Sequence, residues 1–146
     1  MKNALHSISK ILFSLILVLP IIGTLGLFPP PTRDLYNTDI AFSFIEMLTE
    51  VGYINYMMVA VHLVTLVALW SRREALAALI ITPITANVVG FHLVIDGGLL
   101  TGGAVLGNIM LVLNLYLLWK NRKAYENLWR EQQDKSEYQT TAQANN

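Results

Sequence analysis

Residues 75–95 read ALAALIITPITANVVGFHLVI and contain no Asp, Glu, Lys or Arg. Charges resume on both sides, with Arg72, Arg73 and Glu74 before this segment and Asp96 directly after it. A run of about 20 apolar residues is long enough to cross a hydrocarbon core about 30 Å thick. Because backbone groups in lipid must bond to one another, this segment is predicted to be a membrane-spanning helix.

Charge-free segments of similar length make up most of the remaining chain, at 11–32, 51–71 and 97–119. The 146 residues are 54% hydrophobic and only 14% charged, whereas soluble domains carry about 25% charged residues. A net charge of zero argues against binding to nucleic acid, which needs a basic surface. We therefore predict an all-α protein with a four-transmembrane-helix bundle. Its single membrane domain would cover 1–131, with spans at about 8–28, 51–71, 75–95 and 100–120.

The cationic residues predict the orientation of this bundle. Nine of the ten Lys and Arg residues precede the first span, separate the second from the third, or follow the fourth, and only Arg33 lies elsewhere. The positive-inside rule places the basic side in the cytoplasm. We expect both termini to be cytoplasmic, and the chain to be a multi-pass protein of the plasma membrane, the bacterial inner membrane. The polar residues 132–146 are expected to form a disordered cytoplasmic tail.

The first outer loop is predicted to contain a short amphipathic helix. Three prolines at 29–31 end the first span, because proline cannot continue a helix. Thr38 or Asp39 can then cap a new helix, and Gly52 can bend the chain into the second span. This helix would lie on the outer surface of the bundle or in the membrane interface. Its apolar residues have helical spacing and are Ile40, Phe44, Met47, Leu48 and Val51.

The first span can also be interpreted as a cleaved signal peptide. Lys2 and Lys10 precede an apolar run, and the small residues Thr24 and Gly26 follow it, as in secretory signals. However, the apolar run continues to Phe28, which is long for a signal peptide, so we expect a retained helix. The other three spans keep the same orientation in either case.

A few polar side chains lie inside the predicted spans, where their cost in lipid makes them candidates for function. His92 and Asp96 are four residues apart and can meet. Together with Asn87, and with His62 from the second span, they are candidates for a small polar pocket that binds a quinone or a lipid headgroup. Two alternatives stay open: the same residues can form interhelical hydrogen bonds, or the histidines and Asp96 can form a proton relay.

The sequence excludes several kinds of cofactor and catalysis. The absence of cysteine rules out disulfides, thiolate-bound zinc, iron–sulfur clusters and cysteine catalysis within this chain. It contains no phosphate loop, no HExxH and no G-x-S-x-G. A haem between His62 and His92 is disfavoured, because the helical rise puts them at depths that differ by roughly 12 Å. We expect no metal and no cofactor of its own, and whether the chain is an enzyme stays open.

Two parts of the chain resemble the DoxX-like family of small four-helix membrane proteins. One is TPITANVVGFH at 82–92, and the other is LNLYLLW at 113–119, followed by Arg122, Tyr125 and Leu128. The resemblance covers roughly residues 52–129. The positions that match the family are Pro83, Asn87, Phe91, His92, Asn114, Tyr116 and Trp119.

This resemblance implies a function as well as a fold. The family is named for a membrane subunit of a thiosulfate:quinone oxidoreductase, so it implies an accessory or quinone-facing subunit of a membrane redox system. Its partners would be lipid and membrane or peripheral oxidoreductase subunits. Relatives often carry a lysine and a glutamate in helix two, where this chain has Val59 and His62. The alternatives are a small transporter or channel, forming a homo-oligomer because four helices enclose little space, and a non-catalytic membrane scaffold.

Overall fold

The computed structural model describes residues 2–126, and the predicted polar tail at 132–146 lies outside them. Within the described residues there is no β-strand, which confirms the all-α prediction. The elements are α1 (Lys2–Thr24), the short 3-10 helix η1 (Arg33–Leu35), α2 (Asp39–Val51), α3 (Tyr53–Trp70), α4 (Glu74–Val94) and α5 (Ala104–Lys120).

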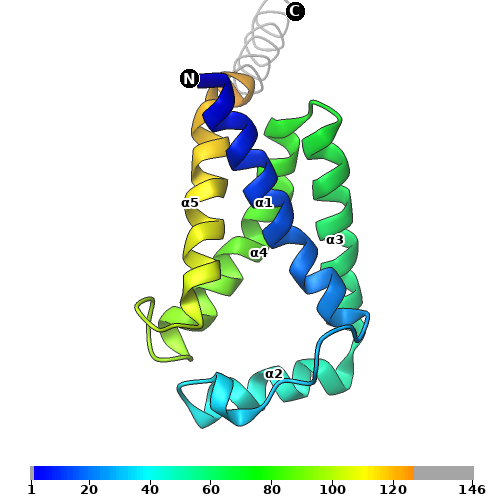
Figure 1. Cartoon of the computed structure of the whole chain (residues 1–146), viewed down its shortest axis with the longest axis vertical. Helices are drawn as coiled ribbons and strands as arrows, with labels where there is room; N and C mark the ends of the chain where they lie inside the picture. Colours follow the sequence, from blue (N-terminus) through cyan, green and yellow to red (C-terminus); the bar gives the residue numbers. More distant parts are fainter. Residues whose placement is uncertain (1, 127–146) are drawn as a thin grey trace, which may run out of the picture.

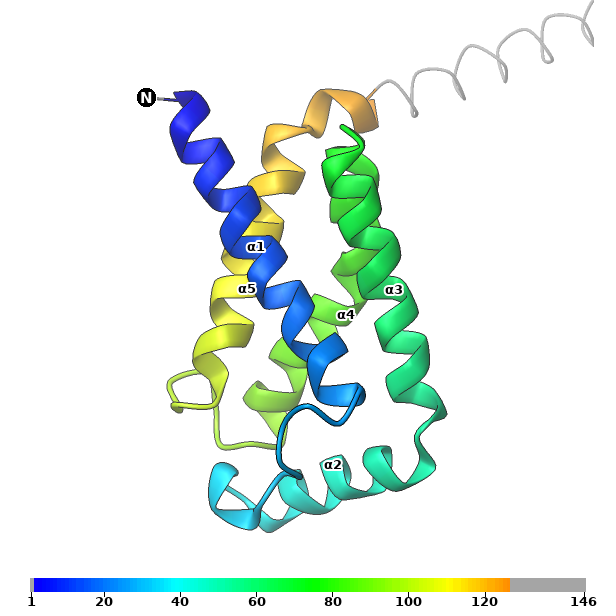
Figure 2. The same ribbon diagram turned by 45° about the vertical axis from the view of Figure 1, so that its right-hand side comes forward.

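The four long helices form an elongated bundle, and α2 lies across one end of it (Figure 1). Helix α4 packs against α3 and α5, and α1 packs against the same two helices from the other side. The start of α1, the turn at 71–73 and the end of α5 lie together at one end, which we call the basic end (Figure 2). The opposite end, which we call the α2 end, holds residues 25–52 and 95–103.

Three of these helices are long and apolar enough to cross a membrane: α1 over Ala4–Thr24, α3, and α4. Helix α5 is also apolar but has only 17 residues. At 1.5 Å per residue it spans about 25 Å, less than a hydrocarbon core of about 30 Å. The helices therefore have the composition of a membrane bundle, with one helix shorter than predicted.

The outward-facing surface of the bundle is apolar. Leu15, Val67 and Val112, on three different helices, are 61%, 67% and 64% exposed. Soluble monomers rarely expose large continuous apolar patches, so this surface is compatible with a lipid environment. Trp70 and Trp119 are exposed near the basic end, as is usual for tryptophans at a membrane interface.

The interior combines large side chains on α1 with small ones on α4. Phe13 and Leu17 are fully buried on α1, and they face a core that includes Leu117 of α5. Ala77 and Ala78 of α4 are fully buried as well. Small residues allow helix backbones to approach closely, which is how helices associate in lipid, where apolar burial adds little.

Two helix ends differ from the predicted spans, and glycines explain both. Helix α1 ends at Thr24 instead of about residue 28, because Gly26 has a φ of 75°, a left-handed conformation that stops a helix. Helix α5 begins at Ala104 instead of about residue 100. Gly97 and Gly98 have φ values of 86° and 108°, so the preceding connection turns away from helical geometry.

The predicted amphipathic helix is present as α2. Thr38 caps it, since its Oγ1 accepts the backbone N–H of Ala41 at 3.1 Å. Gly52, with a φ of 71°, separates α2 from α3 and makes the predicted bend. Ala41 is the buried residue of this helix, whereas Ile40 and Met47 on its apolar side are exposed. An exposed apolar side on a helix at the bundle end fits a place in the membrane interface.

Candidate functional site

Of the four residues predicted to line a polar pocket, His92 and Asp96 are in direct contact. The Nδ1 atom of His92 lies 2.9 Å from Oδ2 of Asp96, as their four-residue spacing predicted. The side chain of Asp96 is almost fully buried, and that of His92 is 13% exposed. This pair sits where α4 ends, at the α2 end of the bundle.

Asp96 connects the end of α4 to the segment that precedes α2. Its Oδ1 accepts the backbone N–H of Asn37 at 2.8 Å, while its Oδ2 faces His92. Beside it, the hydroxyl of Thr38 donates to the backbone carbonyl of Ile95 at 2.6 Å. Two segments far apart in the sequence are therefore joined by side chain–backbone hydrogen bonds, and the start of α2 is held against α4.

The hydrogen bonds around Asp96 favour its ionised form. Burial opposes ionisation of Asp96, but its hydrogen bonds with Asn37 and His92 outweigh burial and hold the pKa of the carboxyl below its usual value. Burial raises the pKa of the nearby Tyr36 hydroxyl, and the negative charge of Asp96 raises it further. Because both oxygens of Asp96 already have partners, the pair is suited to holding the loop in place.

His62 and Asn87 make their hydrogen bonds within their own helices. The Nδ1 atom of His62, a buried residue, lies 2.6 Å from the carbonyl oxygen of Met58, one turn earlier in α3. Asn87 is exposed, and its Nδ2 donates to the carbonyl oxygen of Pro83 at 2.9 Å. No hydrogen bond among the described residues joins either side chain to the Asp96 pair.

The two candidate histidines also lie at different heights in the bundle. His62 is nine residues after the start of α3, and His92 is two residues before the end of α4. Both counts start from the α2 end of the bundle, so the heights differ by about 10 Å along the helices. The separation of the two histidines is therefore close to the roughly 12 Å expected from the helical rise.

The remaining positions that match the DoxX-like pattern are spread over the bundle. Asn114 is buried on α5, where its Nδ2 donates to Oγ1 of Thr82 at 3.1 Å and so links α5 to α4. Its Oδ1 is buried without a partner among the described residues. Phe91 lies near the α2 end, whereas Tyr116 and Trp119 lie near the basic end. These residues therefore do not converge on one site.

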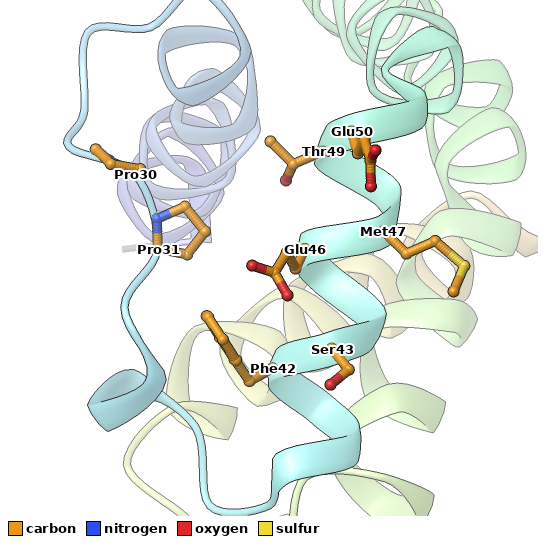
Figure 3. A pocket seen from close by; sticks show the side chains of 8 residues that line it. All are labelled: Pro30, Pro31, Phe42, Ser43, Glu46, Met47, Thr49 and Glu50. Carbon is orange, nitrogen blue, oxygen red and sulfur yellow. The ribbon is translucent and has the colours of Figure 1, made fainter.

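A cavity of about 600 Å³, widely open to the surface, lies between the proline segment and α2, at a place the sequence did not predict (Figure 3). Phe42, Glu46 and Thr49 project from α2 toward Pro30 and Pro31. Their spacing of four and three residues puts them on one side of the helix, a signal present in the sequence. The sequence did not show that the proline segment runs back alongside α2. The lining also includes Ser43, Met47 and Glu50.

A second polar cluster, also missed in the sequence, lies at the basic end. The carboxylate of Glu74 is 2.9 Å from Nε2 of His6, 3.1 Å from Nζ of Lys10 and 3.6 Å from Nζ of Lys120. The hydroxyl of Tyr125 donates to the carbonyl of Ala75 at 2.9 Å. An acidic residue beside two arginines was the only sign in the sequence, since its partners are on α1 and α5.

Comparisons with protein-family models, with curated proteins and with solved structures give no match. The resemblance to the DoxX-like family therefore stays a prediction. Among residues 2–126, no group of three or more His, Asp or Glu side chains is placed to hold a metal ion. The functional argument depends on the two polar regions described above, the cavity beside α2 and the cluster around Glu74.

Proposed function

We propose that this chain is a four-span protein of the plasma membrane, with both termini cytoplasmic, and an accessory, quinone-facing subunit of a membrane redox system. Three long apolar helices and an apolar outer surface support the membrane placement. In this proposal α5 is the fourth span, and the charged residues that follow it lie at the basic end. Among the described residues, the basic end gathers the lysines and arginines that follow the positive-inside rule, and Arg33 lies at the α2 end.

The cavity beside α2 carries the quinone-facing part of the proposal. Its volume of about 600 Å³ falls within the usual range for small-molecule sites, about 300–1,000 Å³. Pro30, Pro31 and Phe42 offer an apolar wall to a quinone ring. The hydroxyl of Ser43 can donate a hydrogen bond to a quinone carbonyl, and the carboxylate of Glu46 can accept a proton that a quinol releases.

This assignment differs from the pocket predicted around His92. In the proposal, His92 and Asp96 hold the start of α2 and do not touch the quinone, because the oxygens of Asp96 are already hydrogen-bonded. The cavity lies at the α2 end, which the proposed orientation places at the outer membrane interface. A quinone would enter it sideways from the lipid, with its tail remaining among acyl chains.

Quinone binding to the purified protein tests the cavity directly. In mild detergent, a short-chain quinol analogue should bind to the unaltered chain, and Glu46→Leu should weaken binding by about tenfold or more, since the hydrogen bond that a quinol hydroxyl donates to the charged carboxylate contributes about 1.5–3 kcal/mol. The matched control is Glu126→Leu, an exposed acid at the opposite end, which should bind as the unaltered chain does. Absence of binding, or equal binding by both variants, would contradict the quinone role.

The proposed accessory role predicts that a partner protein and quinone purify together with this chain. Purification from native membranes in mild detergent should recover a second oxidoreductase chain together with bound quinone, identified by mass spectrometry and by the visible spectrum. A colourless homo-oligomer without either companion would contradict this role and would favour the transporter or scaffold alternatives.

The orientation can be tested with single cysteines, because the chain has none of its own. Asp39→Cys, at the start of α2, should react with an impermeant thiol reagent added outside intact cells, whereas Arg73→Cys should react only after the membrane is opened. Both native side chains are exposed, so a difference in labelling reports the side of the membrane and not burial. The reverse pattern would show that the orientation is wrong.

A further inference from the structure

The basic end contains a second cavity, of about 310 Å³. Two cationic side chains line it, Lys10 from α1 and Arg72 from the turn between α3 and α4, together with His6, Glu74 and Trp70. The ring of Trp70 lies under the ammonium of Lys10 at 4.9 Å. An exposed tryptophan beside cations is typical of the level of lipid headgroups in a membrane.

The charge around this cavity is positive even though Glu74 belongs to it. Glu74 is the one carboxylate in contact with His6, Lys10 and Lys120, so two lysines share a single negative charge. Arg72 makes no ion pair among the described residues. With Lys10, Lys120 and Arg72 against Glu74, the local balance is positive before any charge on His6 is counted.

Arg72 occupies a backbone position that favours glycine. Its φ is 61°, and among the described residues it is the single non-glycine with a positive φ. The N–H of Arg73 donates to the carbonyl of Ala68 at 2.9 Å, which is the closing hydrogen bond of a helix C-terminus with its left-handed residue at Arg72. Glycine would adopt this conformation without strain. The backbone therefore does not explain why this position is an arginine, which points to a role of its guanidinium group.

His6 also lines this cavity. Its Nε2 contacts Glu74, whereas its Nδ1 is buried without a partner among the described residues.

We propose that this cavity binds a phosphate group, through Arg72 and Lys10. The position of Trp70 points to the phosphate of an anionic phospholipid as its natural source, and a soluble phosphate compound has the same chemistry. Arginine suits this role because its planar donors match phosphate oxygens. The proposal rests on the membrane placement and is independent of quinone binding, which would occur at the opposite end of the bundle.

The test compares two neighbouring arginines. Affinity for phosphatidylglycerol is measured by native mass spectrometry of the full chain in detergent, for the unaltered chain and for Arg72→Gly and Arg73→Gly. Each variant loses one positive charge, and glycine is acceptable to the backbone at both places, one a helix C-terminus and the other the N-cap of α4. Arg72→Gly should weaken binding about fivefold or more, without loss of resistance to unfolding by SDS. Arg73→Gly should weaken it clearly less, because Arg73 does not line the cavity.

A second measurement identifies the source of the phosphate group. Inorganic phosphate at millimolar concentration should leave phosphatidylglycerol bound if the site is a headgroup site, whereas displacement by phosphate, also sensitive to Arg72→Gly, would support the soluble source. Equal losses in the two glycine variants would overturn the proposal, because they would mean general attraction to a basic surface. No loss in either variant would overturn it as well.

Discussion

Replacing Asp96 with alanine is expected to lower the free energy of unfolding by about 2–3 kcal/mol, because hydrogen bonds to a buried charged group are among the strongest in proteins. The carboxylate accepts the N–H of Asn37 and contacts Nδ1 of His92 at 2.8 and 2.9 Å. Alanine would leave both groups without an acceptor and would release the start of α2 from the end of α4. Unfolding by SDS in mixed micelles, followed by circular dichroism, measures the change.

One further variant separates charge from shape at this position, and a second, at Asp34, serves as a control. Asp96→Asn keeps an oxygen that can accept the Asn37 N–H but removes the negative charge, so it should cost roughly half as much as alanine, about 1–1.5 kcal/mol. Asp34→Ala removes an exposed acid from the same connection and should leave the unfolding midpoint unchanged. If Asp96→Ala proved no more harmful than Asp34→Ala, the proposed link between α4 and α2 would be wrong.

The same carboxylate predicts a specific response to acid. Hydrogen bonding holds the pKa of Asp96 in the folded protein below its usual value of 3.8. A group with a lowered folded pKa contributes stability that is fully present above the unfolded pKa and is lost as the pH falls through the folded pKa. The unaltered chain should therefore lose more stability than Asp96→Asn when the pH is lowered from about 5 to about 3. Identical pH profiles would show that Asp96 is not held as an anion.

Local patterns were sufficient for most of the fold. Charge-free segments predicted the four long helices, helical spacing predicted α2, and Gly52 was correctly expected to bend the chain. The contact between His92 and Asp96 was also predictable, since residues four apart meet on any helix. In each case the deciding interaction lies within one helix or one turn, where sequence spacing determines distance.

Contacts between distant segments could not be predicted in the same way. The hydrogen bond from Asn37 to Asp96 joins residues 59 apart, and the contact of His6 with Glu74 joins residues 68 apart. Both depend on how neighbouring helices are rotated and how far they slide along one another. Four apolar helices with nearly uniform surfaces contain little information on either quantity. The sequence therefore identified candidate site residues by their residue type. Their partners, and the cavity beside α2, could be seen only once the helices were packed together.

Gly107 tests the packing of α5 against α4. Replacing it with leucine is expected to lower the free energy of unfolding by about 3 kcal/mol or to prevent folding. A Cβ atom at Gly107 would lie 3.0 Å from Cγ1 of Val88 and 3.5 Å from Cδ2 of His92. Added atoms in a closely packed interface force backbones apart, at about 1–3 kcal/mol for small excesses. The matched control is Gly90→Ala on α4, where a Cβ would meet no atom within 4 Å. Alanine there should stabilise the helix by about 0.5–1 kcal/mol.

A double-mutant cycle then identifies the neighbour responsible. Gly107→Ala adds one methyl group against Val88, and Val88→Ala removes both methyl groups of that side chain, including Cγ1, the atom nearest to the added methyl. If α4 and α5 meet as closely as the 3.0 Å distance implies, Gly107→Ala should cost about 1 kcal/mol less in the Val88→Ala background than alone. Strictly additive effects would mean that the two positions do not share space. The glycine would then have no packing role, and the close approach of α5 to the His92–Asp96 pair would need another explanation.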